Sequence, residues 1–200
     1  MSTSLIYRSA RGYELLMRTL YGRHYVDRMR VVAEQVPQGA SVLELCCGPG
    51  TLYQRFLRHR ASAYIGLDVN DGFVEKLRRQ GIDARRLDLS GPDALPEADV
   101  ALMQASLYHF LPHAADVVER MVAAAGDRVV ISEPIKNLAS SELPLIGQLG
   151  RRAADPGVGG HAHRFDEQSL DALMRPYAER VLNRFEIPGG REKVYVLAAS

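Results

Sequence analysis

Apolar residues follow two kinds of pattern, short continuous runs and helical spacings, which alternate through the middle of the chain. The short runs predict buried strands at 42–45, 63–69, 84–89, 98–104 and 128–132. Apolar residues spaced three or four apart predict the intervening helices at 51–60, 73–80 and 113–125. Strands that alternate with helices favour a parallel sheet with right-handed crossovers.

Both ends of the chain depart from this alternation. Residues 5–36 contain no proline, and their helical spacing predicts two helices broken near Gly22. Near the C-terminus, a helix around 169–173 precedes two β-rich runs, 181–187 and 193–198, joined by a Pro-Gly-Gly turn. This pattern is typical of a hairpin, so we expect the last strand to be antiparallel to its neighbour.

Charge, hydropathy and cysteine content argue against several classes of protein. The chain has 200 residues, an apolar fraction of 46% and a net charge of +1, which fits one globular domain without a nucleic-acid footprint. No apolar stretch reaches the roughly 18 residues of a membrane span, and no secretory signal is evident. The two cysteines, Cys46 and Cys47, are adjacent and unsuited to a disulfide, so we expect a cytoplasmic protein. Without further ligands nearby, they indicate no metal site.

The most informative chemistry follows the first predicted strand, in Glu44-Leu-Cys-Cys-Gly-Pro-Gly50. Parallel α/β sheets bind nucleosides at such a sequence of elements: a strand that ends in an acid, then a glycine turn, then a helix. The third glycine of a dinucleotide motif is missing, because Tyr53 stands there, and Pro49 has no N–H for a phosphate. Glu44 would also repel a phosphate. These features disfavour NAD and FAD and fit S-adenosylmethionine, which has positive groups and no phosphate.

The ordered motifs resemble those of class I S-adenosylmethionine-dependent methyltransferases. The turn resembles the E/D-x-G-x-G-x-G motif of that family, with Glu44 as the acid and Gly48 and Gly50 as the second and third glycines. Cys46 replaces the first glycine. The resemblance covers about residues 40–200 and implies S-adenosylmethionine as the cofactor, held in part by these four residues.

The resemblance also implies cofactor contacts at the ends of the next two strands. Asp68 ends the second strand, where the family's acid accepts both ribose hydroxyls, and Val69 would lie against the adenine. Asp88 would accept from the adenine amino group, with the backbone of Leu89 supporting the ring. An alternative for Asp88 is an ordinary turn or cap.

The fourth and fifth strands would end on the side of the transferring methyl group. Gln104 would line the methionine moiety, and Tyr108 the cofactor pocket. His109 and Glu133 are the candidate general bases, His109 because its pKa lies near neutrality. The alternative for His109 is a packing or capping role at the start of a helix.

The resemblance completes the predicted architecture. We expect a Rossmann-like, doubly wound, mostly parallel seven-stranded α/β sheet with an antiparallel C-terminal hairpin and an N-terminal helical cap. The single domain would comprise the cap (1–37), the cofactor-binding core (38–134), a substrate lid or loop (135–165) and the final helix and hairpin (166–200). Of the cap tyrosines, most would pack and one or two would cover the cofactor: Tyr7, Tyr13, Tyr21 and Tyr25.

The predicted loop carries His161, His163 and Arg164, which we expect to contact the substrate. The predicted function is methyl transfer by in-line displacement to an O, N or C nucleophile of a small molecule, without nucleic acid, membrane or metal. Three alternatives stay open: a non-catalytic S-adenosylmethionine-binding subunit, a nucleic-acid methyltransferase and, least favoured, a nicotinamide dehydrogenase. The acceptor and the oligomeric state do not follow from the sequence.

Overall fold

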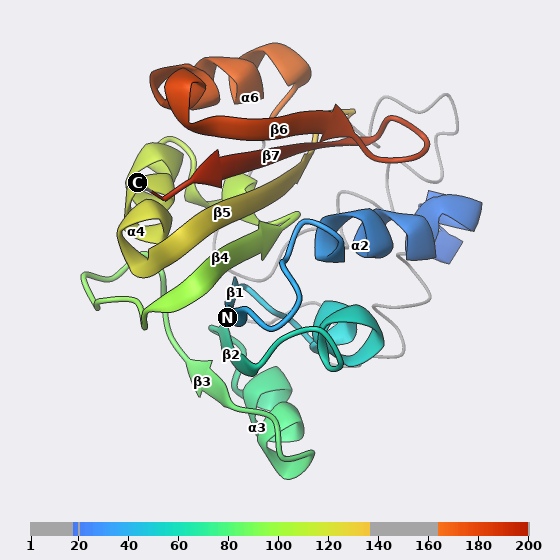
Figure 1. The fold of residues 1–200 in the computed structure, drawn as a ribbon, viewed down its shortest axis with the longest axis vertical. Coiled ribbons are helices and arrows are strands. Elements are labelled where there is room, and N and C mark those ends of the chain that lie inside the picture. Colours follow the sequence, from blue (N-terminus) through green and yellow to red (C-terminus); the bar gives the residue numbers. More distant parts are fainter. Residues whose placement is uncertain (1–17, 20, 137–163, 200) are drawn as a thin grey trace, which may run out of the picture.

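A seven-stranded sheet forms the centre of the computed structural model, which describes residues 18, 19, 21–136 and 164–199 (Figure 1). Its strands are β1 (Ser41–Leu45), β2 (Ala63–Asp68), β3 (Ala84–Arg86), β4 (Ala98–Gln104), β5 (Ala125–Pro134), β6 (Val181–Glu186) and β7 (Glu192–Ala198). Their order across the sheet is β3-β2-β1-β4-β5-β7-β6. Strands β1 to β5 pair in parallel, and β7 is antiparallel to both β5 and β6. The predicted α/β fold with its C-terminal hairpin is therefore confirmed.

Helices cover both faces of the sheet. They are η1 (Gly22–His24), α2 (Tyr25–Ala33), the π-helical η2 (Tyr53–Leu57), α3 (Asp71–Arg79), η3 (Leu107–Phe110), α4 (Ala114–Ala124), α6 (Glu167–Met174) and η5 (Arg175–Arg180). One apolar core joins α2 and η2 to the sheet, and a second joins α4 and α6 to the opposite face. The domain is thus three layers thick, as a parallel sheet buried on both faces requires.

Strand β4 shows why the apolar runs form central strands. Its side chains alternate between the two cores: Val100 and Leu102 pack on the α2 side, and Ala101 and Met103 on the α4 side. All four are fully buried. A strand buried on both faces therefore reads as a continuous apolar run, which is why its predicted and observed bounds agree.

Element ends differ from the prediction where side chains redirect the backbone. The third strand ends at Arg86, and beyond it the Asp88 carboxylate accepts the Ser90 N–H at 2.9 Å within a turn. Helix α3 begins at Asp71 because the Asn70 side chain caps it, accepting from the amides of Gly72 and Phe73. Strand β5 is longer than predicted, since it begins directly after α4.

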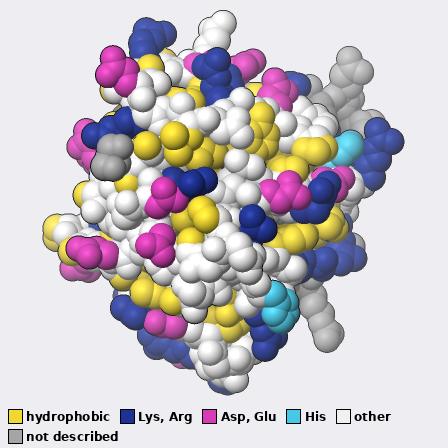
Figure 2. Space-filling model, in the orientation of Figure 1, with side chains coloured by type: hydrophobic (Ala, Val, Ile, Leu, Met, Phe, Trp, Pro, Cys, Tyr) yellow, Lys and Arg dark blue, Asp and Glu magenta, His cyan; other side chains and the backbone are white. Residues whose placement is uncertain are grey.

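Much of the predicted cap and loop, residues 1–17 and 137–163, lies outside the described residues. Within the described part, no helix combines the length and hydropathy needed to cross a bilayer. On the face shown in Figure 2, basic and acidic side chains are interspersed rather than separated into patches of one sign.

Candidate functional site

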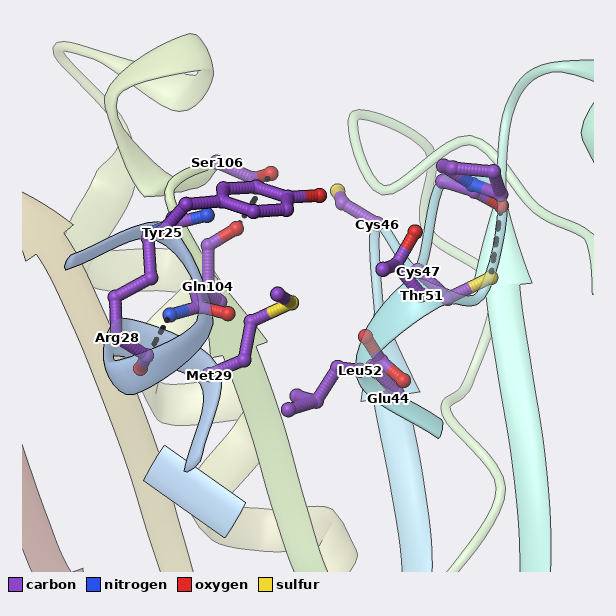
Figure 3. Close-up of a pocket in the computed structure, with 12 residues that line it drawn as sticks. Tyr25, Arg28, Met29, Glu44, Cys46, Cys47, Thr51, Leu52, Gln104 and Ser106 are labelled. Atoms are coloured by element: carbon purple, nitrogen blue, oxygen red, sulfur yellow. Dashed lines mark hydrogen bonds between the residues drawn. The ribbon is translucent and has the colours of Figure 1, made fainter. Parts of the chain in front are cut away.

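A cleft opens at the carboxyl edge of the sheet, between the ends of β1 and β4 and beneath α2 (Figure 3). Strand order reverses here, since β2 and β4 lie on opposite sides of β1, and such crevices bind ligands in open α/β sheets. The cleft encloses about 480 Å³, counting the space open to solvent. Its lining residues are Tyr25, Arg28, Met29, Glu44, Cys46, Cys47, Gly48, Pro49, Thr51, Leu52, Gln104 and Ser106. Figure 3 shows the residues of α2 facing those of the glycine turn across the opening.

The glycine turn has three residues in the left-handed backbone region. They are Cys46 (φ 53°), Gly48 (φ 55°) and Gly50 (φ 70°). A Cβ at Gly50 would also lie 2.6 Å from Leu77 Cδ2. This position therefore requires glycine both for its positive φ and for lack of space. The left-handed conformation of Cys46 gives a physical reason for the glycine that the family motif has at this place.

The ends of β1 and β4 turn in the same unusual way. Ala105, directly after β4, has a φ of 54°, and with Cys46 it makes up the described non-glycine residues with positive φ. Each directly follows the last residue of its strand, and these two strands, β1 and β4, pair in parallel beside the cleft. Backbone strain of this kind is concentrated at functional sites, which strengthens the assignment of the cleft.

Asp68 ties the end of β2 to the glycine turn. Its Oδ2 accepts the Gly48 N–H at 2.7 Å, and its Oδ1 accepts the Asn70 N–H at 2.8 Å. Burial raises the pKa of Asp68, while these backbone hydrogen bonds oppose the rise. Beside it, the Val69 side chain is 48% exposed, which leaves an apolar surface next to this carboxylate.

Glu44 is a buried carboxyl group on the wall of the cleft, and its residue is only 5% exposed. The Tyr64 hydroxyl donates to Glu44 Oε2 at 2.7 Å, and the Tyr64 ring stacks on Tyr53 with centroids 4.0 Å apart. Glu44 forms no ion pair with any described residue. Burial raises the pKa of Glu44 to about 8, the Tyr64 hydrogen bond lowers it, and the charge of Asp68 raises it. An acid of this kind suits a cationic ligand, which would compensate its charge.

Gln104 lies on the opposite wall of the cleft, and its contact with the methionine moiety stays a prediction. Its Nε2 donates to the Arg28 carbonyl at 3.2 Å and to Glu192 Oε2 at 3.3 Å. Both bonds join the end of β4 to elements far away in the sequence.

Glu133, a predicted general base, is fully buried and does not line the cleft. Its Oε1 accepts the amides of Ser106 and Leu107, each at 2.6 Å, and so fixes the loop between β4 and η3. Its Oε2 has no hydrogen-bond partner among the described residues. Burial raises the pKa of Glu133 to about 8, and the loop amides oppose the rise. The structure thus shows a role in holding the loop, and the catalytic role stays a prediction.

Tyr108 and His109 belong to η3, after that loop, and Arg164 contacts the Tyr108 ring. The Arg164 guanidinium lies 4.1 Å from the Tyr108 ring centroid, and the Tyr108 and His109 rings lie 4.0 Å apart at an angle of 39°. Tyr108 is buried in the core on the α4 side, and none of the three lines the cleft. Their predicted roles in the pocket, in base catalysis and in substrate contact stay predictions, and His161 and His163 lie outside the described residues.

The structure does not bring the third predicted strand end to the cleft. Asp88 is exposed and shapes a turn, and Leu89 is buried in the core on the α4 side. Neither residue lines the cleft, so their adenine contacts stay predictions. Among the described residues, no group of three His, Cys, Asp or Glu side chains is placed to hold a metal ion.

Sequence reasoning missed much of the cleft wall. Tyr25 was among the tyrosines expected to pack or to cover a cofactor, but Arg28, Met29 and Ser106 were not singled out. One available signal was Arg28, a charged residue that shares the buried side of its helix with Tyr25, Met29 and Val32.

Comparisons with known proteins agree with the motifs. No family model matches the chain. By sequence, the chain is 31% identical over 100 residues to a trans-aconitate 2-methyltransferase of Mycolicibacterium gilvum and 33% identical over 96 residues to one of Mycobacterium tuberculosis. The first match covers 50% of this chain but only 38% of that relative, and the second 46% and 36%.

By structure, the chain is similar to the magnesium protoporphyrin IX methyltransferase of Synechocystis PCC 6803 with bound S-adenosylhomocysteine. The TM-score is 0.65 at 16% identity, over 97% of each chain. A similar match is an S-adenosylmethionine-dependent methyltransferase from Aquifex aeolicus, with a TM-score of 0.60 at 14% identity over 94% of this chain and 98% of that one. The predicted resemblance to class I methyltransferases is therefore confirmed, in sequence for about half the chain and in fold for nearly all of it.

Proposed function

We propose that this protein is an S-adenosylmethionine-dependent methyltransferase that acts on a small molecule. The observation that carries the proposal is Glu44, a buried carboxyl group that faces the cleft without a cation among the described residues. It stands beside a glycine turn that disfavours a phosphate. A ligand with positive groups and no phosphate compensates this acid, and S-adenosylmethionine is such a ligand.

The cleft and the adjoining end of β2 offer groups of the right chemistry for each part of this cofactor. Glu44 would attract its positive end, Asp68 would accept from the ribose hydroxyls, and the exposed Val69 would support the adenine. Gln104, on the α2 side, would contact the methionine part. Once bound, the cofactor supplies a methyl group that its sulfonium already activates.

The residues of the chain then need chiefly to align the acceptor and to exclude water. The helix α2 supports this role, since Tyr25 and Met29 cover one side of the cleft. A general base is required only where the acceptor must lose a proton. His109 and Glu133 are our proposed candidates, since both lie at the loop that follows β4.

The acceptor class is proposed from the curated relatives. They carry the name trans-aconitate 2-methyltransferase, so a small polycarboxylic acid is the first acceptor to test. Arg164 supports this choice as a guanidinium that forms no ion pair with a described residue. We also propose a cytoplasmic location, which the two free thiols support.

Calorimetric titration with S-adenosylmethionine and with NAD tests the cofactor. Transfer of a labelled methyl group, with and without trans-aconitate and other carboxylic acids, tests the reaction. We expect S-adenosylmethionine to bind and NAD not to bind, and we expect the labelled methyl group to appear in the carboxylic acid. Preferential NAD binding would refute the cofactor, and tight cofactor binding without labelled product across cell extracts would favour a non-catalytic subunit. Steeply salt-dependent RNA or DNA binding would favour a nucleic-acid substrate.

A further inference from the structure

A row of polar side chains ends the α2 face of the sheet at its carboxyl edge. Gln104 of β4 and Ser132 of β5 stand opposite each other in register, and Glu192 begins β7. Glu192 points to the α2 face, as do Val194 and Val196, which follow it at alternate positions. Because β7 is antiparallel, its first residue lies where the parallel strands end.

Glu192 is the centre of a buried network that joins five parts of the chain. Its residue is 0% exposed, and the Arg28 guanidinium approaches its Oε1 from Nε at 2.8 Å and from Nη2 at 2.5 Å. The Tyr21 hydroxyl donates to the same oxygen, and the Arg28 guanidinium lies over the Tyr21 ring at 4.3 Å. Ser132 Oγ donates to Oε2 at 2.9 Å, and Gln104 Nε2 at 3.3 Å.

Two of these donor residues, Arg28 and Gln104, line the α2 side of the cleft, although Glu192 does not line it. Arg28 belongs to α2, between the lining residues Tyr25 and Met29, and Gln104 belongs to the end of β4. Figure 3 shows the Gln104 amide beneath α2, donating to the Arg28 carbonyl. One buried carboxylate therefore sets the position of both the helix and the amide relative to each other.

We infer that Glu192 is a positioning residue for the proposed cofactor, which it serves by fixing α2 and Gln104 at the methionine end of the cleft. The inference rests on the proposed function. A binding site is effective when the side chains that touch the ligand are held by a second set of contacts, and the four residues that donate to Glu192 supply them. A buried ion pair adds little to stability by itself, because removing two charges from water costs about as much as their attraction returns. A role in positioning α2 and Gln104 therefore explains the network better than a contribution to the stability of the fold does.

The test is Glu192→Gln, with S-adenosylmethionine affinity measured by calorimetry at a temperature where circular dichroism shows a folded protein. Gln keeps the shape but removes the charge and replaces one acceptor oxygen by a donor. We expect affinity to fall about tenfold or more, because small displacements of positioning groups have effects of that size. We expect KM for the cofactor to rise while kcat at saturation changes by less than about threefold. Glu186→Gln, in the same hairpin but exposed and paired with Lys136 at 3.8 Å, should leave affinity unchanged.

A second control separates positioning from stability. Leu170→Ala truncates a fully buried side chain in α6, on the opposite face, and should lower the melting temperature without lowering cofactor affinity. If Glu192→Gln does not fold, Ser132→Ala removes one donor from Glu192 and should still weaken binding about threefold. The inference would be overturned if the folded Glu192→Gln or Ser132→Ala variant bound S-adenosylmethionine with wild-type affinity. It would also be overturned if Leu170→Ala lost as much cofactor affinity as that variant. A wild-type protein that binds no S-adenosylmethionine refutes the proposed function, and this inference falls with it.

Discussion

Replacing Glu44 by Gln should make the protein more stable at high pH and weaken cofactor binding. The substitution keeps an oxygen that accepts the Tyr64 hydroxyl but removes the titrating proton and the negative charge. Glu44 has a pKa of about 8 in the fold against an ordinary value of 4.5. That difference corresponds to about 5 kcal/mol for ionising the buried group, as an upper bound.

The sign of the stability effect follows from proton binding. The folded protein holds the Glu44 proton more tightly than the unfolded chain, so the associated stability is fully present below pH 4.5. It is lost as the pH rises through about 8. We therefore expect the unfolding free energy of Glu44→Gln, relative to wild type, to increase by up to about 5 kcal/mol between pH 4.5 and 8.5. Glu133 titrates in the same range but is present in both proteins, so its contribution cancels.

The binding effect has the opposite sign. The ionised carboxylate attracts the cofactor, so the ratio of wild-type to variant affinity should rise by up to about tenfold per pH unit from pH 6 to 8. This ratio also cancels the titration of the ligand itself. Urea denaturation and calorimetric titration at matched pH values measure the two effects. Glu75→Gln, an exposed acid on α3, is the matched control and should show neither. A ratio independent of pH, or a variant no more stable than wild type at pH 8.5, would refute this account of Glu44.

Three further substitutions test the glycine turn and the neighbouring strand β2. Cys46→Gly should raise the unfolding free energy by about 1 kcal/mol by relieving the left-handed conformation, and increased cofactor affinity would show that the thiol also crowds the ligand. Asp68→Asn should weaken cofactor binding about tenfold in calorimetry, because the amide loses the charge that holds the Gly48 N–H and the ribose hydroxyls; unchanged affinity would contradict the ribose assignment. Gly66→Ala should destabilise by about 1–3 kcal/mol in thermal unfolding, since its Cβ would lie 2.8 Å from a tyrosine hydroxyl, whereas Gly126→Ala, with its nearest atom at 3.7 Å, should cost much less.

The central sheet and one wall of the cleft could be predicted from the sequence because their signals are local. A parallel strand buried on both faces has to be a continuous apolar run, and β4 shows the result in its predicted bounds. The acid and glycines of the first turn lie within seven residues of sequence. Their spacing was therefore enough to predict that Glu44, Cys46 and Gly48 lie close together. In the structure all three residues line the cleft.

The other wall could not be predicted because its contacts are distant in sequence. Arg28 and Glu192 are 164 positions apart, and no local pattern indicates that they meet. Side-chain chemistry alone was also insufficient for Asp88, which fits an adenine contact and a turn equally well, and the structure shows a turn. For Glu133, the sequence could not show that one oxygen is committed to loop amides.

The antiparallel direction of β7 has a consequence for the order in which the protein is made. Glu192 lies next to the cleft-lining Arg28 and Gln104 only because its strand runs antiparallel between β5 and β6. The recognition motifs at 44–50, 68 and 104 are therefore synthesised well before the residue that joins α2 to them. A nascent or truncated chain that ends before β7 would contain every motif by which a cofactor site is recognised, and still lack a contact that closes it. We expect cofactor to support folding only after this last strand has joined the sheet.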